Sequence, residues 1–298
     1  MIKLLKNYNM KQIVLVAFIS LLLFSCKKNT DTIVVQPQPT TVAASTQMDV
    51  SYGTDPLQKM DVYLPANRTA ATKLMIMIHG GGWSQGDKTD LNQYLDTLKR
   101  RLPTYAFINI NYRLAVNALT TFPTQENDVK AAINYIYSKK NEFIVSDKFV
   151  LLGASAGAHL ALLQAYKYNN TVKIKAVVDF FGPTDMTAMY NDPAPLAPAS
   201  SIAQLFNNDT PTTNPNAYMQ SSSINYVSTA SSMPTIILHG GMDPLVKPTQ
   251  ATALRDKLLL ANIATQYVFY PSEGHGWGGA PLTDSFDKIQ AFLTQYVQ

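Results

Sequence analysis

The sequence predicts an α/β fold in which helices cover both faces of a mostly parallel β-sheet. Short apolar runs alternate with longer amphipathic segments along the chain, as they do in folds of this class. About 250 residues follow the N-terminal region, a length that suits one large domain. The predicted strands are residues 60–64, 74–78, 106–110, 149–153, 176–181, 235–239 and 265–270.

Between these strands, apolar residues recur with the period of a helix that buries one face. Two segments have this pattern: Val129, Ala132, Ile133 and Ile136 in the first, and Phe286, Ile289 and Leu293 in the second. The segment 183–233 interrupts the alternation because it is rich in Asn, Thr, Ser and Pro. We expect it to be an insertion, either a small cap over a cleft or a plain surface excursion.

Residues 1–25 have the pattern of a signal peptide, with three lysines ahead of the apolar run 13–24. That run is too short to span a bilayer. It ends in "LFSC", which resembles the lipobox of bacterial lipoproteins and implies cleavage before Cys26 and attachment of lipid to it. The expected location is therefore the bacterial cell envelope, at the periplasmic face or the cell surface. The alternative is an ordinary signal peptide whose cysteine is incidental.

Residues 26–47 are predicted to form a tether, because they are rich in Thr, Pro and Gln without a helical or strand period. The catalytic domain is expected to span 48–298. Cys26 is the only cysteine, so the chain can form no internal disulfide. Loss of the lysines of residues 1–25 would reduce the net charge from +4 to about +1, which gives no support for nucleic-acid binding.

The stretch "LLGASAGAHLALL" (151–163) places Ser155 between a predicted strand and an apolar helical segment. Gly153 and Gly157 bracket the serine, as in the Gly-x-Ser-x-Gly nucleophile elbow, where a tight strand-to-helix turn exposes the hydroxyl. This short pattern also occurs by chance, so the assignment depends on partners elsewhere in the chain.

Candidate partners follow the ends of two later strands, where ligands bind to open α/β sheets. Asp243 follows strand 235–239, and His275 follows strand 265–270. The chain order Ser, Asp, His is that of α/β-hydrolases. A serine hydroxyl becomes an effective nucleophile when an imidazole accepts its proton and a carboxylate orients that imidazole. We therefore predict Ser155, His275 and Asp243 as nucleophile, base and acid.

The motif "HGGGW" (79–83) follows strand 74–78. Consecutive glycines allow backbone N–H groups to approach a substrate oxygen that side chains would otherwise block. We predict that Gly81, Gly82 and Ala156 supply the donors of an oxyanion hole. Trp83 and Trp277 flank the predicted site from two loops and are predicted to form a wall for the substrate, with buried packing as the alternative.

The remaining histidines are expected to be structural. His79 is expected to tie down the glycine loop, His159 to point into the packing of a helix on the sheet, and His239 to lie inside a strand end. Three other acids compete with Asp243 but have less suitable positions: Asp179, Asp185 and Glu273. The chain has no His-x-x-x-His pair, no cysteine cluster and no phosphate-binding Gly-x-x-x-x-Gly-Lys loop, so we predict no metal and no cofactor.

Several motifs in order resemble those of α/β-hydrolase carboxylesterases, especially the esterase domain of feruloyl and acetyl-xylan esterases. They are "HGGGWSQGDK", "NYRLAVNALTTFPTQENDVKAAINYI", "GASAGAHLALL", "SSSINYV" and "HGGMDPLV", and the resemblance covers about residues 48–298. It implies an α/β-hydrolase fold with the insertion as a cap. Ala154 stands where hormone-sensitive-lipase-like esterases have an acid, and this favours the carbohydrate-esterase and kynurenine-formamidase groups.

The function that the sequence favours is a serine carboxylic-ester hydrolase, which acts through an acyl-enzyme on short-acyl or feruloyl esters of plant polysaccharide. An arylformamidase and a lipid or short-chain esterase are the alternative enzymes, and the export signal argues against the first of these. A catalytically inactive surface binding protein is the alternative of another class. The complete Ser155, Asp243 and His275 set argues against it, since a binding protein has no need of all three.

Overall fold

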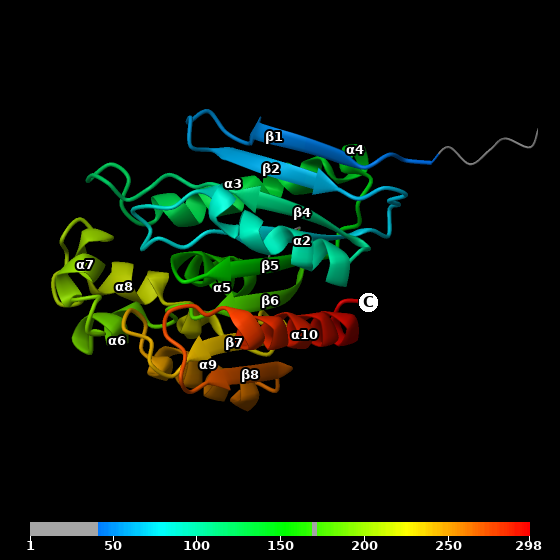
Figure 1. Ribbon diagram of the computed structural model, residues 1–298. Coiled ribbons are helices and arrows are strands. Elements are labelled where there is room, and N and C mark those ends of the chain that lie inside the picture. The colour runs from blue at the N-terminus through cyan, green and yellow to red at the C-terminus, as the bar shows by residue number, and fades with distance from the viewer. Residues whose placement is uncertain (1–40, 169–171) are drawn as a thin grey trace, which may run out of the picture. The chain divides into compact units, whose positions relative to one another are not determined.

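The computed structural model describes residues 41–168 and 172–298, and within them eight strands form one sheet in the order β1-β2-β4-β3-β5-β6-β7-β8 (Figure 1). The strands are β1 (Ser45–Ser51), β2 (Lys59–Leu64), β3 (Lys73–Ile78), β4 (Tyr105–Ile110), β5 (Phe149–Ala154), β6 (Ile174–Phe180), β7 (Thr235–Gly240) and β8 (Thr265–Tyr270). β3 to β8 are mutually parallel, whereas β2 runs antiparallel to both of its neighbours. The predicted mostly parallel sheet is confirmed.

All seven predicted strands are present, and each predicted boundary lies within two residues of the observed one. The pairing aligns their carboxyl ends: Ile78 of β3 is level with Gly153 of β5, and Gly240 of β7 is level with Tyr270 of β8. The loops that follow these strands therefore emerge at one edge of the sheet, where the predicted site residues lie.

The first strand, β1, was not predicted. It begins at Ser45, inside the segment expected to be a tether, so the boundary of the folded domain lies at least three residues before residue 48. Its side chains are mostly exposed, and a bulge between Gln47 and Val50 breaks the alternation that would have marked a strand. Residues 1–40, with the predicted signal peptide, Cys26 and most of the predicted tether, lie outside the described residues.

Helices cover both faces of the sheet, as predicted. The helices flanking the strands are η1 (Lys88–Leu91), α2 (Asn92–Arg101), α3 (Thr124–Ser138), α4 (Lys140–Phe143), α5 (Ala156–Lys167), α9 (Pro248–Leu260) and α10 (Gly279–Tyr296). One apolar layer joins α3, α5 and α9 to the sheet, and the other joins α2 and α10 to the opposite face. The two predicted helical stripes are buried on α3 and α10. None of the helices in the described ranges is both long enough and apolar enough to cross a bilayer.

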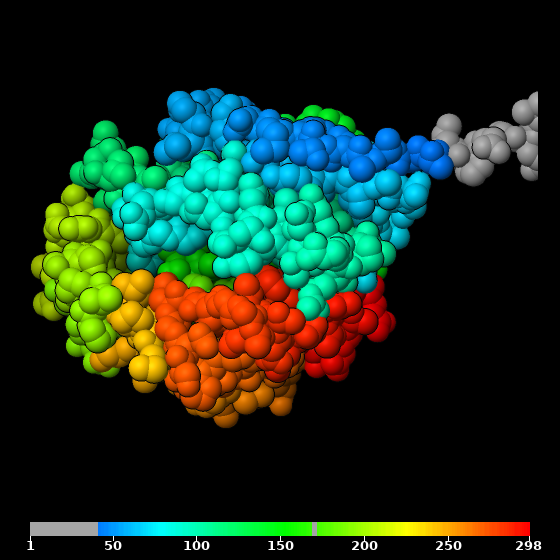
Figure 2. All heavy atoms as spheres, in the orientation of Figure 1, coloured from blue at the N-terminus to red at the C-terminus, as the bar shows by residue number. Residues whose placement is uncertain are grey.

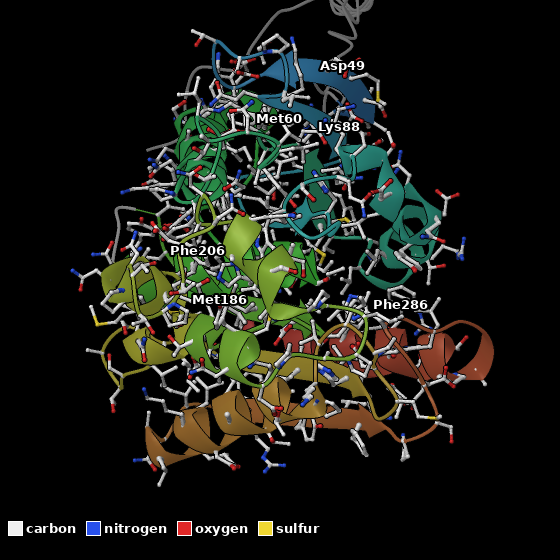
Figure 3. All side chains as sticks on the ribbon, turned by 90° about the vertical axis from the view of Figure 1, so that its left-hand side faces the viewer. Asp49, Met60, Lys88, Met186, Phe206 and Phe286 are labelled. Atoms are coloured by element: carbon white, nitrogen blue, oxygen red, sulfur yellow. The ribbon has the colours of Figure 1, made fainter. Side chains whose placement is uncertain are left out.

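The insertion after β6 contains short helices: α6 (Met186–Asn191), α7 (Ala199–Gln204), α8 (Pro215–Ser221) and η2 (Ser223–Tyr226). α6, α7 and α8 lie together beyond one end of the sheet (Figure 1). Figure 3 looks onto this end and shows Met186 and Phe206 within the insertion, in front of the sheet, with Phe286 of α10 to one side. The insertion therefore lies at the carboxyl ends of the parallel strands, as expected of a cap.

Candidate active site

Ser155 lies in the turn between β5 and α5 with a backbone φ of +54°, a value that a residue with a side chain rarely adopts. The glycines on either side permit this turn. A Cβ atom on Gly157 would lie 2.1 Å from the carbonyl oxygen of Ile78, and one on Gly153 would lie 2.4 Å from the backbone of α5. Strand and helix are thus in direct contact at the elbow, and only glycine fits at these two positions of the tight turn.

The structure brings Ser155, His275 and Asp243 together from three different loops. The hydroxyl of Ser155 lies 2.9 Å from Nε2 of His275, and Nδ1 of the same ring lies 2.7 Å from Oδ2 of Asp243. Both contacts have the length of strong hydrogen bonds. The three side chains form the series hydroxyl, imidazole and carboxylate in which a proton can move from serine to histidine.

The Asp243 carboxylate is fixed from its other side by the backbone that follows it. Its Oδ1 accepts hydrogen bonds from the N–H groups of Leu245 (2.8 Å) and Val246 (2.9 Å). Burial opposes the charged form, but these bonds and the one from His275 hold the pKa of Asp243 below its ordinary value. The carboxylate is therefore ionised and held in place where it can orient the imidazole.

The three competing acids do not contact His275. Asp179 lies inside β6, where burial raises its pKa to about 7 and its Oδ1 accepts a bond from the Gly182 N–H. The Asp185 side chain caps α6 through the N–H of Ala188. Glu273 shares the loop of His275, and its backbone carbonyl accepts a bond from Met242. Asp243 is thus the acid that the fold brings to the imidazole.

His159 is fully buried, and both of its ring nitrogens are engaged. Nε2 donates to the carbonyl oxygen of Ser221 (2.6 Å), and Nδ1 accepts from Trp83 Nε1 (3.1 Å). Burial lowers the pKa of His159 to about 4, so the ring is neutral at pH 7. His239 is also buried and donates to the carbonyl of Val246. Both histidines are structural, as predicted.

The glycine loop after β3 is held at its start by stacked aromatic rings. The His79 ring lies parallel to that of Tyr112, with 4.3 Å between their centroids. The Tyr112 hydroxyl donates to the carbonyl oxygens of His79 and Gly80, at 3.1 Å each. These contacts agree with the structural role predicted for His79.

Two of the predicted oxyanion donors border the cleft of Ser155, and the third belongs to the residue that follows Ser155 in the chain. Gly81 and Gly82 line the same cleft as Ser155, with φ values of +96° and +55°. No acceptor for either N–H is present within residues 41–168 and 172–298. Ala156 is the first residue of α5, so its N–H has no acceptor within the helix. The backbone thus offers candidate donors around the cleft of Ser155.

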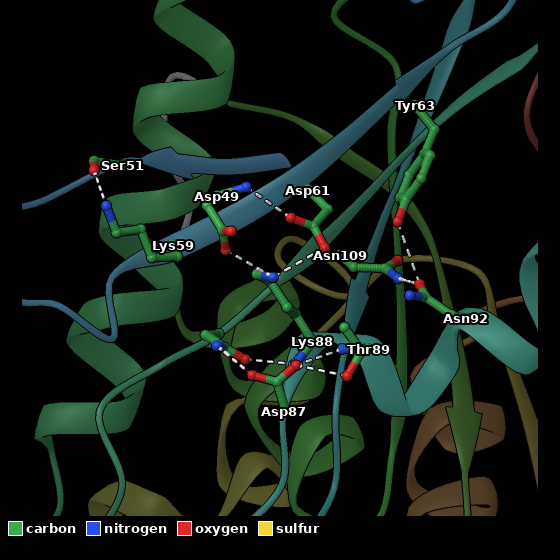
Figure 4. A network of polar contacts seen from close by, with 11 residues as sticks. Asp49, Ser51, Lys59, Asp61, Tyr63, Asp87, Lys88, Thr89, Asn92 and Asn109 are labelled. Carbon is green, nitrogen blue, oxygen red and sulfur yellow. Dashed lines mark hydrogen bonds and ion pairs between the residues drawn. The ribbon is translucent and has the colours of Figure 1, made fainter. Parts of the chain in front are cut away.

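The far end of the glycine loop is anchored by a buried ion pair, shown in Figure 4. The Lys88 ammonium contacts Asp61 Oδ2 and Asp49 Oδ1, each at 3.0 Å. Asp61 is fully buried on β2. The backbone N–H of Lys88 donates to the side chain of Asn111, which also donates to Asp87 (2.8 Å). The "GDK" part of the loop motif therefore joins the loop to the edge of the sheet.

We expect Lys88→Met to lower the free energy of unfolding by about 3–5 kcal/mol, because it leaves the buried carboxylate of Asp61 without its countercharge. Urea denaturation measures this change. Lys59→Met is the matched control, since among the residues that the structure describes the Lys59 ammonium hydrogen-bonds only to the exposed hydroxyl of Ser51, and the change should alter the free energy by no more than about 0.5 kcal/mol. Equal losses in the two variants would contradict this role for Lys88.

The two tryptophans do not form a common wall, which corrects the prediction for Trp83 and Trp277. The Trp83 side chain lines the cleft of Ser155 but is buried against His159, with 4% exposure. Trp277 packs on Phe180 and Phe181 and lines a separate hollow. Each indole N–H has a protein partner, and for Trp277 this is Ser285 Oγ at 2.9 Å.

The cleft that contains Ser155 and His275 has a volume of about 490 Å³. The insertion contributes Met189 of α6 and Ile202 of α7 to its walls, and Leu245, two residues after Asp243, is among the other apolar residues that line it. The insertion is therefore a cap over the cleft and not a remote surface excursion. In the described part of the chain, His, Cys, Asp and Glu side chains form no group of three or more that could hold a metal ion.

Comparison with known proteins identifies relatives of this chain. The chain is 26% identical over 216 residues to Esterase LipQ of Mycobacterium tuberculosis (strain ATCC 25618 / H37Rv). The aligned region covers 68% of this chain and 50% of that protein. The chain thus spans about half the length of this relative.

Two solved structures have similar folds. A truncated carbohydrate esterase from gut microbiota superimposes with a TM-score of 0.75 at 26% identity, covering 85% of this chain and 96% of that one. A bifunctional GH43-CE protein of Bacteroides eggerthii gives a TM-score of 0.71 at 25% identity, over 84% of this chain and 35% of that one. The fold is that of the α/β-hydrolase esterases, and because the BD-FAE family model matches residues 60–258, the chain belongs to the BD-FAE family.

Proposed function

We propose that this chain is a serine carboxylic-ester hydrolase that acts through an acyl-enzyme on short-acyl or feruloyl esters of plant polysaccharide. The observation that carries the proposal is the hydrogen-bonded series from Ser155 through His275 to Asp243, at 2.9 and 2.7 Å, at the wall of an open cleft. Membership of an esterase family and the likeness to carbohydrate esterases support the choice of an ester.

In the proposed reaction, the Ser155 hydroxyl attacks the ester carbonyl while His275 accepts its proton. The Asp243 carboxylate stabilises the imidazolium that forms. The oxyanion accepts hydrogen bonds from the N–H groups of Gly81, Gly82 and Ala156. His275 then gives the proton to the departing alcohol, which leaves the acyl group on Ser155. A water molecule then attacks the carbonyl of the acyl-enzyme while His275 accepts its proton, and the carboxylic acid product leaves Ser155.

The cleft supports an ester with a short acyl group. Its capping insertion is rich in small polar residues and prolines. A lipid esterase needs a long apolar surface, because each buried methylene contributes about 0.8 kcal/mol to transition-state binding. A sugar alcohol suits this cleft, because its lining includes the polar side chain of Gln204.

A series of p-nitrophenyl esters, with acetylated xylan, a feruloyl ester and N-formylkynurenine, tests the proposed function. We expect kcat/KM to be highest for acetyl and other short esters and to fall by tenfold or more for chains of about eight carbons, because small polar residues and prolines dominate the capping insertion. A steady rise from acetate to laurate with no action on xylan would favour a lipid esterase. Preferred hydrolysis of N-formylkynurenine would favour an arylformamidase.

We also propose that the protein is exported and held in the bacterial cell envelope by lipid on Cys26, which lies outside the described residues. The apolar run and the "LFSC" motif support this location. Cys26→Ser should remove the protein from the membrane fraction without changing the kcat of the domain. Retention of this variant in the membrane fraction would contradict the anchor.

A further inference from the structure

A second hollow adjoins the Ser155 cleft on the side of α2 and α10. Its volume is about 190 Å³, and most of its lining is apolar. The side chains that matter here are Tyr94 and Leu98 of α2, Leu152 of β5, and Trp277, Leu282 and Phe286 of the C-terminal segment. Figure 2 shows the surface hollowed between the cyan atoms of the α2 region and the orange-red atoms of the C-terminal segment, with green atoms at the floor. We refer to this hollow as the apolar chamber.

Three residues border both the Ser155 cleft and the apolar chamber: Gly80, Ala154 and Phe181. Gly80 has no side chain, and that of Ala154 is a methyl group. Phe181 is therefore the only large side chain of this shared wall. Its removal would join the chamber to the cleft beside the catalytic serine.

The Phe181 ring is held in this wall from several sides. Its centroid lies 4.5 Å from that of His275 and 5.5 Å from that of Trp277. The Phe181 N–H donates to the carbonyl oxygen of Leu238 (2.8 Å), and its φ is +46°. A bulky residue in this region of φ is strained, and such strain persists where the surroundings fix the residue, commonly at functional sites.

We propose that Phe181 sets the acyl length that this enzyme accepts, because its ring separates the acyl group bound at Ser155 from the apolar chamber. With the ring removed, the chamber would receive the alkyl chain of a medium-length acyl group. This inference rests on the proposed function, since it requires an acyl group at Ser155. It also gives a physical cause for the expected preference for short esters.

The activity test compares p-nitrophenyl octanoate with p-nitrophenyl acetate. Phe181→Ala should raise the ratio of their kcat/KM values by about tenfold or more, since each additional buried methylene favours binding about fourfold. The ratio is the useful quantity because loss of the contact with His275 would slow both esters alike. Phe181→Leu, which keeps more apolar volume in the wall, should shift the ratio in the same direction by less.

Leu282→Trp provides the matched control, because it fills the chamber from α10 and leaves the three residues of the shared wall unchanged. Introduced into Phe181→Ala, it should return the ratio to the native value. An unchanged ratio in both Phe181 variants would overturn the proposal. A raised ratio that persists with Trp at position 282 would also overturn it, since the chain would then lie elsewhere.

A binding measurement separates this inference from the proposed function. Calorimetry with octanoate needs no turnover and uses three proteins, all of which carry Ser155→Ala. Adding Phe181→Ala should tighten octanoate binding by about tenfold. Adding Leu282→Trp to that double variant should reverse this gain. Equal affinities in all three proteins, with ester hydrolysis intact in the native enzyme, would overturn the role of Phe181 alone. Tighter binding in the Phe181→Ala protein, with no ester hydrolysis by the native enzyme, would support the chamber and overturn the proposed reaction.

Discussion

Ser155→Ala should reduce kcat by about 10⁶-fold while leaving the fold intact, as the loss of the nucleophile does in other serine hydrolases. The side chain contributes only its hydroxyl to the site, where it contacts His275 at 2.9 Å. Removal of that oxygen leaves no atom to carry the acyl group. The turnover of p-nitrophenyl acetate gives the rate, and thermal unfolding shows that the variant is folded.

Ser201→Ala is the matched control for this variant. Ser201 lines the same cleft, but its hydroxyl donates to the carbonyl oxygen of Pro198, the residue that precedes α7. We expect its kcat to stay within a few-fold of the native value. If Ser155→Ala kept a tenth of the native activity, or if Ser201→Ala lost as much as Ser155→Ala, the nucleophile would have to be reassigned.

Asp243→Asn should reduce kcat by about 10⁴-fold. The carboxylate accepts a hydrogen bond from the Nδ1–H of His275 and stabilises the positive charge that develops on the ring. An amide of the same shape removes that charge and can present an N–H, which favours the imidazole tautomer with its proton on Nε2. That tautomer cannot accept the proton of Ser155. Steady-state kinetics at pH 8 measures the loss.

Asp185→Asn is the control for the acid. The Asp185 side chain caps α6, and asparagine caps helices about as well as aspartate, so both stability and kcat should be close to native. A large loss of kcat in Asp185→Asn, together with a small loss in Asp243→Asn, would assign the acid to Asp185. The position of Asp185 in the cap argues against that outcome.

Much of this fold could be predicted because its strands are buried on both faces and therefore appear as continuous apolar runs. "KLMIMI" and "FVLLGA" are examples, and the residues that follow such runs must meet at one edge of a parallel sheet. The sequence therefore predicts that Ser155, Asp243 and His275 lie together at this edge. The edge strand β1 was missed because its polar, exposed side chains leave no apolar run.

Features that depend on contacts between distant segments could not be predicted. Phe181 was placed inside a strand, whereas it is the first residue after β6 and turns into the wall beside the site. Trp83 was expected to face the substrate, but His159 and a positive φ turn its ring into the protein. In each case the sequence identifies an aromatic residue near the site, and only the tertiary packing decides which way it faces.

The Arg113–Asp128 pair is a further example. The segment that begins "NYRLA" was recognised only by its resemblance to known esterases, and its sequence gave no physical reason for the arginine. In the structure, the Arg113 guanidinium makes two hydrogen bonds to the Asp128 carboxylate, at 2.8 and 2.7 Å. This pair joins the strand-end loop to α3, and the two residues are too far apart in the chain for local spacing to reveal it.

Labelling with a fluorophosphonate, followed by mass analysis of the peptides, tests the central claim most directly, because this reagent reacts with serines that an adjacent base has activated. We predict a single adduct on the peptide that contains Ser155, its complete absence in Ser155→Ala, and loss of esterase activity in proportion to labelling. An unlabelled protein would indicate an inactive binding protein. An adduct on another serine, with activity lost in proportion, would contradict the assignment of Ser155.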